Sequence, residues 1–179
     1  MIGDPILHLP SAEIDALSQE VHESRTKLHK ALAAFRKKFG FGRAIAAPQL
    51  GFPMRFIALN LGQEPFTMHN PTIYKQSEEL FTLWDDCLSF PEMLVRVKRH
   101  KSISVKWYNE KGEQQDWKDL PEHISELLQH EIDHLNGKTS FDSIDGQNAV
   151  IHRDVYLRNK NHYDGLVDYK IVPTINENE

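Results

Sequence analysis

Hydrophobic residues in segment 12–38 recur at the spacing of an α-helix, at intervals of three, four and seven positions. They are Ile14, Leu17, Val21, Leu28, Leu32 and Phe35. Ser11 precedes the segment as a candidate N-cap, and the basic run 36–38 lies where the negative end of a helix dipole favours cations. Gly40 and Gly42 supply stop signals. The pattern predicts a long helix near the amino terminus.

Four later segments are rich in β-branched and aromatic residues and are separated by Gly, Pro or Asn. They cover residues 54–61, 66–76, 81–91 and 102–110. This composition is typical of β-strands. Residues 109–112, Asn-Glu-Lys-Gly, fit the turn of a hairpin that runs from Ile103 to Trp117.

From Pro121 the hydrophobic spacing becomes helical again, with apolar residues on one broad face. They are Ile124, Leu127, Leu128, Ile132 and Leu135. The order of a helix, several strands and a second helix predicts an α+β fold with antiparallel sheet rather than alternating βαβ units. We expect one domain over residues 1–179, with a polar tail after about residue 158 that is less ordered.

Composition and charge narrow the class of protein. The chain has 179 residues, of which 40% are apolar, so it can bury a core, and its formal charge of −5 gives no basic footprint for nucleic acid or an anionic membrane. The amino terminus lacks the features of a secretion signal, and no apolar run reaches the roughly 20 residues that span a bilayer. We expect a soluble, cytoplasmic protein of bacterial type.

The segment HEIDH, residues 130–134, carries the strongest candidate chemistry. On a helix, His130 and His134 share one face and can bind one metal ion. Glu131 lies one position round, where a carboxylate can take the proton of a metal-activated water. The alternative is a solvated helix face that holds two of the chain's 10 histidines by chance.

A third ligand separates the candidate classes of hydrolase. In the metzincin pattern HExxHxxGxxH, Gly137 matches the glycine, but Ser140 occupies the position of the last histidine. Downstream acids lie in no helical motif, so a peptidase with a glutamate ligand is weakly supported. The single cysteine, Cys87, is either a small buried hydrophobe or a soft ligand. As a ligand it completes a Cys-His-His set with one open position.

Three motifs occur in order: GRAIAAPQ at 42–49, DDCLS at 85–89 and HEIDH at 130–134. They resemble the peptide deformylase motifs, roughly GxGLAAxQ, EGCLS and HExDH. The opening MIGDPILHLP and the segment HNPTIYKQSEE also resemble that family's Gly-Asp-Pro opening and Asn-Pro strand. The resemblance covers most of the chain. It implies antiparallel sheets packed around a central helix that carries HEIDH.

The resemblance implies a hydrolase that removes the N-formyl group from formyl-methionyl peptides or nascent proteins by attack of metal-bound water. Cys87, His130 and His134 would bind the metal and Glu131 would be the general base, the same four residues that spacing and ligand chemistry select. Gln49 and the backbone N–H of Leu88 would donate to the formyl oxygen. Fe²⁺ is the implied metal, while Zn²⁺, Ni²⁺ or Co²⁺ also suit the ligands. The ribosome is a further candidate partner.

Departures from the family motifs fall on candidate substrate-binding residues. The candidate substrate-binding residues are Gly42, Arg43, Ala44 and Asp86. Two of them depart from the motifs, because Ala44 and Asp86 replace family glycines. We expect Arg43 and Asp86 to form a charge pair that favours smaller or polar first residues.

Three further acids and two rival functions complete the sequence-based picture. Glu126 lies on a helix turn where an apolar pocket residue is expected, and Asp85 replaces the glutamate of EGCLS. Asp133 either orients a ligand histidine or pairs with Arg99. The rivals are a deformylase-like protein with another N-acyl substrate or only a binding role, and a zinc peptidase that does not need Cys87.

Overall fold

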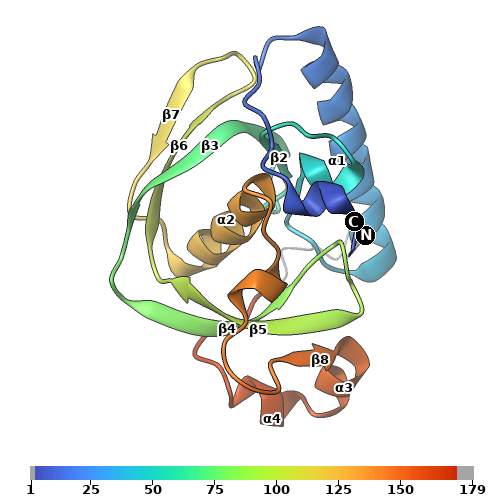
Figure 1. The fold of residues 1–179 in the computed structure, drawn as a ribbon, viewed down its shortest axis with the longest axis vertical. Helices are drawn as coiled ribbons and strands as arrows, with labels where there is room; N and C mark the ends of the chain where they lie inside the picture. Colours follow the sequence, from blue (N-terminus) through green and yellow to red (C-terminus); the bar gives the residue numbers. More distant parts are fainter. Residues whose placement is uncertain (1–2, 173–179) are drawn as a thin grey trace.

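The computed structural model describes residues 3–172 (Figure 1). Its longer helices are α1 (Gln19–Phe39) and α2 (Glu122–Leu135), and the short helices α3 (Arg153–Arg158) and α4 (Lys160–Asp164) follow. The strands are β1 (Ala44–Ala46), β2 (Phe56–Leu59), β3 (Phe66–Gln76), β4 (Leu80–Asp86), β5 (Met93–His100), β6 (Ile103–Tyr108), β7 (Gln114–Trp117) and β8 (Val150–His152). Three 3₁₀ turns lie at Pro5–His8, Ala47–Leu50 and Ser140–Ser143.

Two antiparallel sheets surround helix α2. One has the order β1-β2-β3-β6-β7 and the other the order β4-β5-β8. Figure 1 shows α2 enclosed by the sheets, while α1 runs along the outside near β1 and β2. The predicted α+β class is therefore confirmed, as is the hairpin of β6 and β7.

Burial explains why α2 lies at the centre. Its apolar face, including Leu128, Ile132 and Leu135, packs in one core cluster with residues of the larger sheet. Most of its polar residues are also buried, among them His130, Glu131 and His134. Buried polar side chains on a helix need partners or ligands. The helix therefore points its polar face towards the smaller sheet, where Cys87 directly follows β4 and belongs to a separate apolar cluster.

Helix α1 begins later than the sequence predicts. The Oγ of Ser18, rather than Ser11, accepts from the backbone N–H of Val21 at 3.3 Å. Residues 12–17 are not helical because tertiary partners take their backbone groups: Ala12 pairs with the 53–55 loop, and Asn70 bonds the N–H of Ile14. The predicted end is confirmed, since Gly40 has a φ of 74° and its N–H bonds the Arg36 carbonyl.

Two further parts differ from the prediction. Strand β5 was missed because Arg96 and Lys98 interrupt its apolar residues, yet it pairs with β4 along its length. The tail after residue 158 is less irregular than predicted, because α4 forms and Tyr169 and Ile171 pack against the β4–β5 cluster. The final NENE sequence lies outside the described residues.

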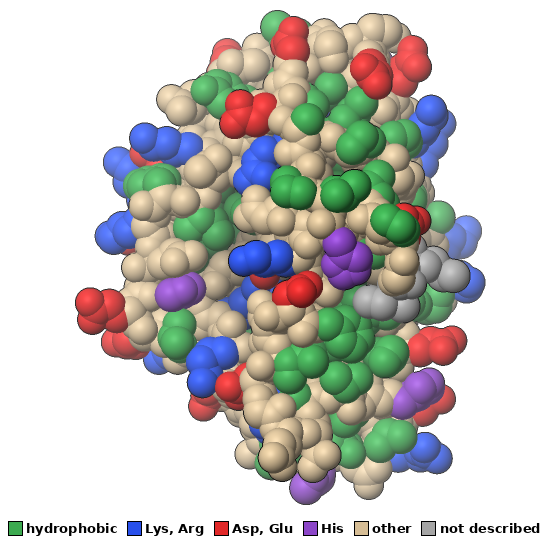
Figure 2. Space-filling model, viewed as in Figure 1, with side chains coloured by type: hydrophobic (Ala, Val, Ile, Leu, Met, Phe, Trp, Pro, Cys, Tyr) green, Lys and Arg blue, Asp and Glu red, His purple; other side chains and the backbone are tan. Residues whose placement is uncertain are grey.

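One face of the molecule carries charged side chains of both signs (Figure 2). Acidic and basic side chains are both scattered over the face shown in Figure 2. Within residues 3–172, no helix is both long and apolar enough to cross a membrane.

Candidate metal centre

The structure brings Cys87, His130 and His134 together. Their candidate ligand atoms all lie within 4.8 Å of one another, and all three residues are buried. The Sγ of Cys87 is 3.2 Å from Nε2 of His134. Tetrahedral coordination by one thiolate and one imidazole places these two atoms about 3.5 Å apart. The donor set and its spacing therefore fit one divalent ion.

Asp85 fixes the ring of His130. Its Oδ2 accepts from His130 Nδ1 at 2.9 Å, which leaves Nε2 as the free lone pair of that ring. The same oxygen accepts from Arg99 Nη2 at 3.0 Å and from Ser140 Oγ at 3.0 Å. Although burial opposes ionisation, His130 and Arg99 hold the pKa of Asp85 well below its usual range. Asp85 is thus a charged anchor for the candidate metal ligand His130.

Sequence analysis did not assign this role to Asp85. Successive side chains of a strand point to opposite faces, so in the DDCLS segment one acid had to face α2 and the other had to face away. That alternation was the available signal. Of the two roles considered for Asp133, the structure supports pairing with Arg99, whose Nη1 donates to Asp133 Oδ2.

The two ligand histidines have opposite electrostatic settings. Burial disfavours the imidazolium of both. At His130 the adjacent Asp85 carboxylate outweighs burial and raises the pKa, whereas at His134 burial, reinforced by the nearby His130, lowers the pKa. His134 therefore offers a neutral ring that is ready to bind a metal.

Glu131 lies beside the ligand set with a free acceptor. It is buried, and its Oε2 has no hydrogen-bond partner among the described residues. Burial raises the pKa of Glu131 to about 7. A carboxyl group poised near neutral pH can accept and return a proton, which is the requirement for a general base and acid.

Gln49 reaches the same centre from the 3₁₀ turn after β1. Its Oε1 accepts from the Ala46 N–H at 2.8 Å, which directs the amide nitrogen inwards. Nε2 lies 3.4 Å from Cys87 Sγ and 3.1 Å from Ser89 Oγ. Leu88 follows Cys87 in the chain and lines two pockets, one that also contains His130 and Glu131 and one that also contains Gln49. The fold thus brings Gln49 and Leu88 next to the candidate ligands.

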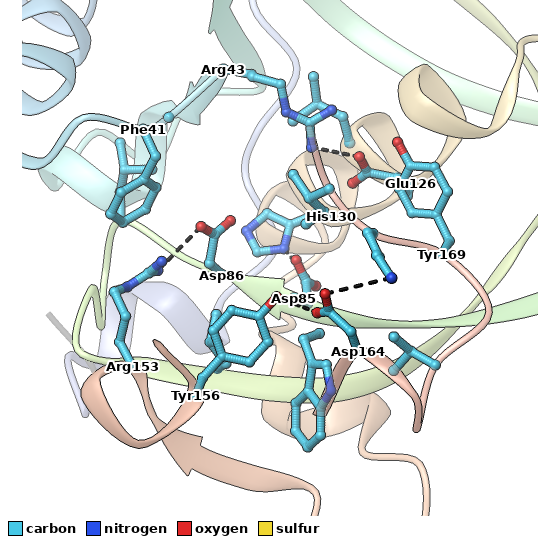
Figure 3. A pocket seen from close by; sticks show the side chains of 18 of the residues that line it. Phe41, Arg43, Asp85, Asp86, Glu126, His130, Arg153, Tyr156, Asp164 and Tyr169 are labelled. Atoms are coloured by element: carbon cyan, nitrogen blue, oxygen red, sulfur yellow. Dashed lines mark hydrogen bonds and ion pairs between the residues drawn. The ribbon is translucent and has the colours of Figure 1, made fainter. Parts of the chain in front are cut away.

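A pocket of about 250 Å³ opens beside His130 and Glu131. Figure 3 shows charged side chains on opposite sides of it, with His130 between them in this view. Arg43 Nη2 donates to Glu126 Oε1 at 2.5 Å, and Arg43 Nη1 donates to the His123 carbonyl at 2.8 Å. The predicted pair of Arg43 with Asp86 is therefore wrong.

Asp86 pairs with Arg153 instead, at 3.1 Å. The Arg153 guanidinium also stacks on Phe41, 4.0 Å from the ring centre. Asp86 is the last residue of β4 and does not have a positive φ, so a glycine is not required there. Asp86 lines the pocket, and its partner comes from the carboxyl-terminal segment.

The first motif keeps the glycine that its backbone needs. Gly42 has a φ of +111°, and a Cβ there would lie 3.3 Å from the ring of Phe35. Ala44, in place of the second family glycine, is a regular residue of β1 paired with Leu59. Its substitution therefore costs the fold no conformational strain.

The model of the polypeptide deformylase family matches residues 1–150. The chain belongs to the polypeptide deformylase family. A peptide deformylase of Thermotoga maritima is 31% identical over 144 residues, which cover 80% of this chain and 84% of that protein. A peptide deformylase of Bartonella henselae is 28% identical over 163 residues, 88% of this chain and 87% of that protein.

Solved deformylases share the fold. The crystal structure of the Thermotoga maritima peptide deformylase has a TM-score of 0.74 and 30% identity, and the match covers 82% of this chain and 95% of that one. A Plasmodium falciparum peptide deformylase in complex with an inhibitor has a TM-score of 0.73 and 27% identity, with 92% and 97% covered. Membership makes the chain a hydrolase of protein biosynthesis that processes amino termini, and implies removal of N-formyl groups.

The polypeptide deformylase match ends before the carboxyl-terminal wall of the pocket. Arg153, Tyr156, Asp164, Tyr169 and Lys170 line the pocket but lie beyond residue 150. Asp164 accepts from Tyr156 at 2.6 Å and pairs with Lys170 at 3.5 Å. One side of the pocket is therefore built by a segment outside the matched family region.

Proposed function

We propose that the chain hydrolyses the formamide bond at the amino terminus of N-formylated peptides and nascent polypeptides. The observation that carries the proposal is the Cys87, His130 and His134 cluster, with the unpartnered Glu131 carboxylate beside it. This is the arrangement expected of a metal-dependent hydrolase that keeps one coordination position open. The three ligands would hold one divalent ion, with Fe²⁺ as our first choice and Zn²⁺, Ni²⁺ or Co²⁺ as alternatives.

A bound divalent ion would supply Lewis acidity, lowering the pKa of a water and polarising the formyl oxygen. Glu131 takes one proton from the attacking water as its oxygen bonds to the formyl carbon. Glu131 then returns that proton to the leaving nitrogen as the C–N bond breaks, which yields formate and a free amine. Its pKa of about 7 suits both directions of transfer near neutral pH.

Gln49 and Leu88 stabilise the charge that develops on the formyl oxygen. The inward Nε2 of Gln49 and the backbone N–H of Leu88 are the two donors we assign to this oxygen. Gln49 is held for this role by its bond to the Ala46 N–H. A donor of this kind contributes about 3 kcal/mol to transition-state stabilisation in other hydrolases.

The substrate sets the partners and the compartment. Because formylated chains emerge from the ribosome, we infer action in the cytoplasm on the nascent polypeptide, with the ribosome as a candidate partner. The mixed charge on the face in Figure 2 gives no support for direct readout of nucleic acid.

One substrate series separates the candidate activities. Protein loaded anaerobically with Fe²⁺ is assayed against a formyl tripeptide, the matching acetyl tripeptide and an internally cleavable peptide with a free amino terminus. We expect formate release from the first substrate alone. Acetate release would support an altered N-acyl substrate, and cleavage of the internal bond would support the peptidase alternative. Tight metal binding without turnover would support a binding role.

A further inference from the structure

The pocket beside His130 contains a buried ion pair on the side formed by the β1 strand and helix α2. The side chains of Arg43 and Glu126 are 7% and 2% exposed. Arg43 comes from the loop before β1, and Glu126 lies one helical turn before His130. Glu126 therefore lies one helical turn from His130, and both partners of the pair line the same pocket as His130.

The lining of this pocket includes both apolar and polar side chains. Leu88, Leu94 and Leu127 line it with hydrocarbon, and Arg43 and Glu126 line it with polar atoms. A substrate side chain that suits both surfaces has an apolar stem and a hydrogen-bonding end. A purely apolar side chain would give the polar atoms of the pair no hydrogen bond, whereas a hydrogen-bonding end can supply one.

The pair also limits the charge of the side chain. Arg43 and Glu126 largely cancel each other's field, and Asp86 with Arg153 forms a second neutral pair across the pocket (Figure 3). A charged substrate group would lose its hydration without meeting a net opposite charge. A carboxamide can donate to the Glu126 carboxylate and accept from the Arg43 guanidinium.

We propose that Arg43 and Glu126 make the pocket selective for N-formyl peptides whose first side chain ends in a neutral amide or hydroxyl group, in preference to the thioether of methionine. Glutamine is the side chain that tests this most sharply, because it has the length and approximate shape of methionine. The inference rests on the proposed function for the position of the peptide, and it adds the class of its first residue.

The experiment compares formyl-Xaa-Ala-Ser peptides in which Xaa is Met, Gln, Glu or Lys, using the Fe²⁺ protein under anaerobic conditions. We expect kcat/KM for the Gln peptide to exceed that for the Met peptide by about tenfold, the usual scale for one satisfied hydrogen bond. The Glu and Lys peptides should both be poorer than Gln. A Met value equal to or above the Gln value overturns the proposal, as does a preference for Glu or Lys.

Substitution of both partners removes the polar end of the pocket. R43L/E126L should move the Gln-to-Met ratio towards Met by about tenfold. Any change in pocket shape acts equally on these two matched side chains, so the ratio reports hydrogen bonding. The exposed pair Lys101–Glu79 is the control, and K101L/E79L should keep the parental ratio. An unchanged ratio in R43L/E126L overturns the role of the pair.

A conservative variant and a binding measurement cover the remaining outcomes. Glu126→Gln keeps a hydrogen-bonding group and should keep the preference for Gln; loss of that preference contradicts the hydrogen-bond argument. Calorimetric titration of the metal-loaded protein with the products Gln-Ala-Ser and Met-Ala-Ser should give the same order of affinity. If no formyl peptide is hydrolysed, the proposed function fails, and this titration still decides the selectivity of the pocket.

Discussion

Removing the charge of Asp85 should weaken both the metal site and the fold. Asp85 is not itself one of the candidate ligands, but its Oδ2 accepts from Nδ1 of His130 at 2.9 Å and from Arg99 at 3.0 Å. Loss of a partner of this kind typically lowers metal affinity 10–100-fold, or about 1.4–2.8 kcal/mol. We therefore expect Asp85→Asn to bind Zn²⁺ or Co²⁺ 10- to 100-fold more weakly, as roughly estimated from such cases.

The stability cost follows from burial. The Asp85 and Arg99 side chains are 3% and 5% exposed, so solvent screens their interaction little. Breaking a buried pair costs about 3–5 kcal/mol. In Asp85→Asn the asparagine keeps one acceptor, and Arg99 keeps its pairing with Asp133. We therefore expect the free energy of unfolding to fall by about 3 kcal/mol, near the lower end of that range.

Two assays separate these effects. Competition with a chromophoric chelator measures metal affinity, and urea unfolding of the metal-free protein measures stability. Asp133→Asn is the matched control, since Asp133 pairs with the same Arg99 and is 22% exposed. It should lower stability by about 1 kcal/mol and leave metal affinity unchanged. Parental metal affinity in Asp85→Asn, or an equal loss in both variants, would refute the assigned role.

Three other changes have definite expected outcomes. Cys87→Ala should abolish stoichiometric metal binding, because two ligands remain; full occupancy by elemental analysis would show that the third ligand lies elsewhere. The pKa of Asp168 is lowered by the hydrogen bonds from Thr82, so this contact stabilises the fold above the ordinary carboxyl pKa and is lost as pH falls through the lower folded-state value. Protection of the Asp168 amide from hydrogen exchange, measured relative to the intrinsic exchange rate at each pH, should fall in acid, and Asp168→Asn should remove that loss of protection. Gly42→Ala should cost about 1–2 kcal/mol in urea unfolding, because of its φ and the nearby Phe35 ring; unchanged stability would remove the need for glycine.

The parts that sequence predicted well depend on short spacing. His130 and His134 face one way because they are four apart on a helix whose apolar periodicity is unambiguous. The hairpin of β6 and β7 depends on a local turn at residues 109–112. Cys87 could be added because it was the only cysteine in the sequence.

The missed features depend on contacts between distant positions. Arg43 and Glu126 are 83 positions apart, and only the packing of α2 against β1 decides that they meet. Arg153 captures Asp86 across 67 positions, which no spacing rule could indicate. The start of α1 was misplaced for the same reason, since Pro53, Arg55 and Asn70 bond the backbone that helical periodicity assigned to the helix.

The rate of formate release per bound metal ion tests the central claim most directly. Anaerobic Fe²⁺ protein is assayed on formyl-Gln-Ala-Ser and formyl-Met-Ala-Ser, alongside Glu131→Gln with the same metal content. We predict turnover by the parent protein and a loss of about 10²–10⁴-fold in the variant, because glutamine cannot accept the proton of water. No formate from any formyl peptide at one metal per chain, or a Glu131→Gln rate close to that of the parent, would contradict the account.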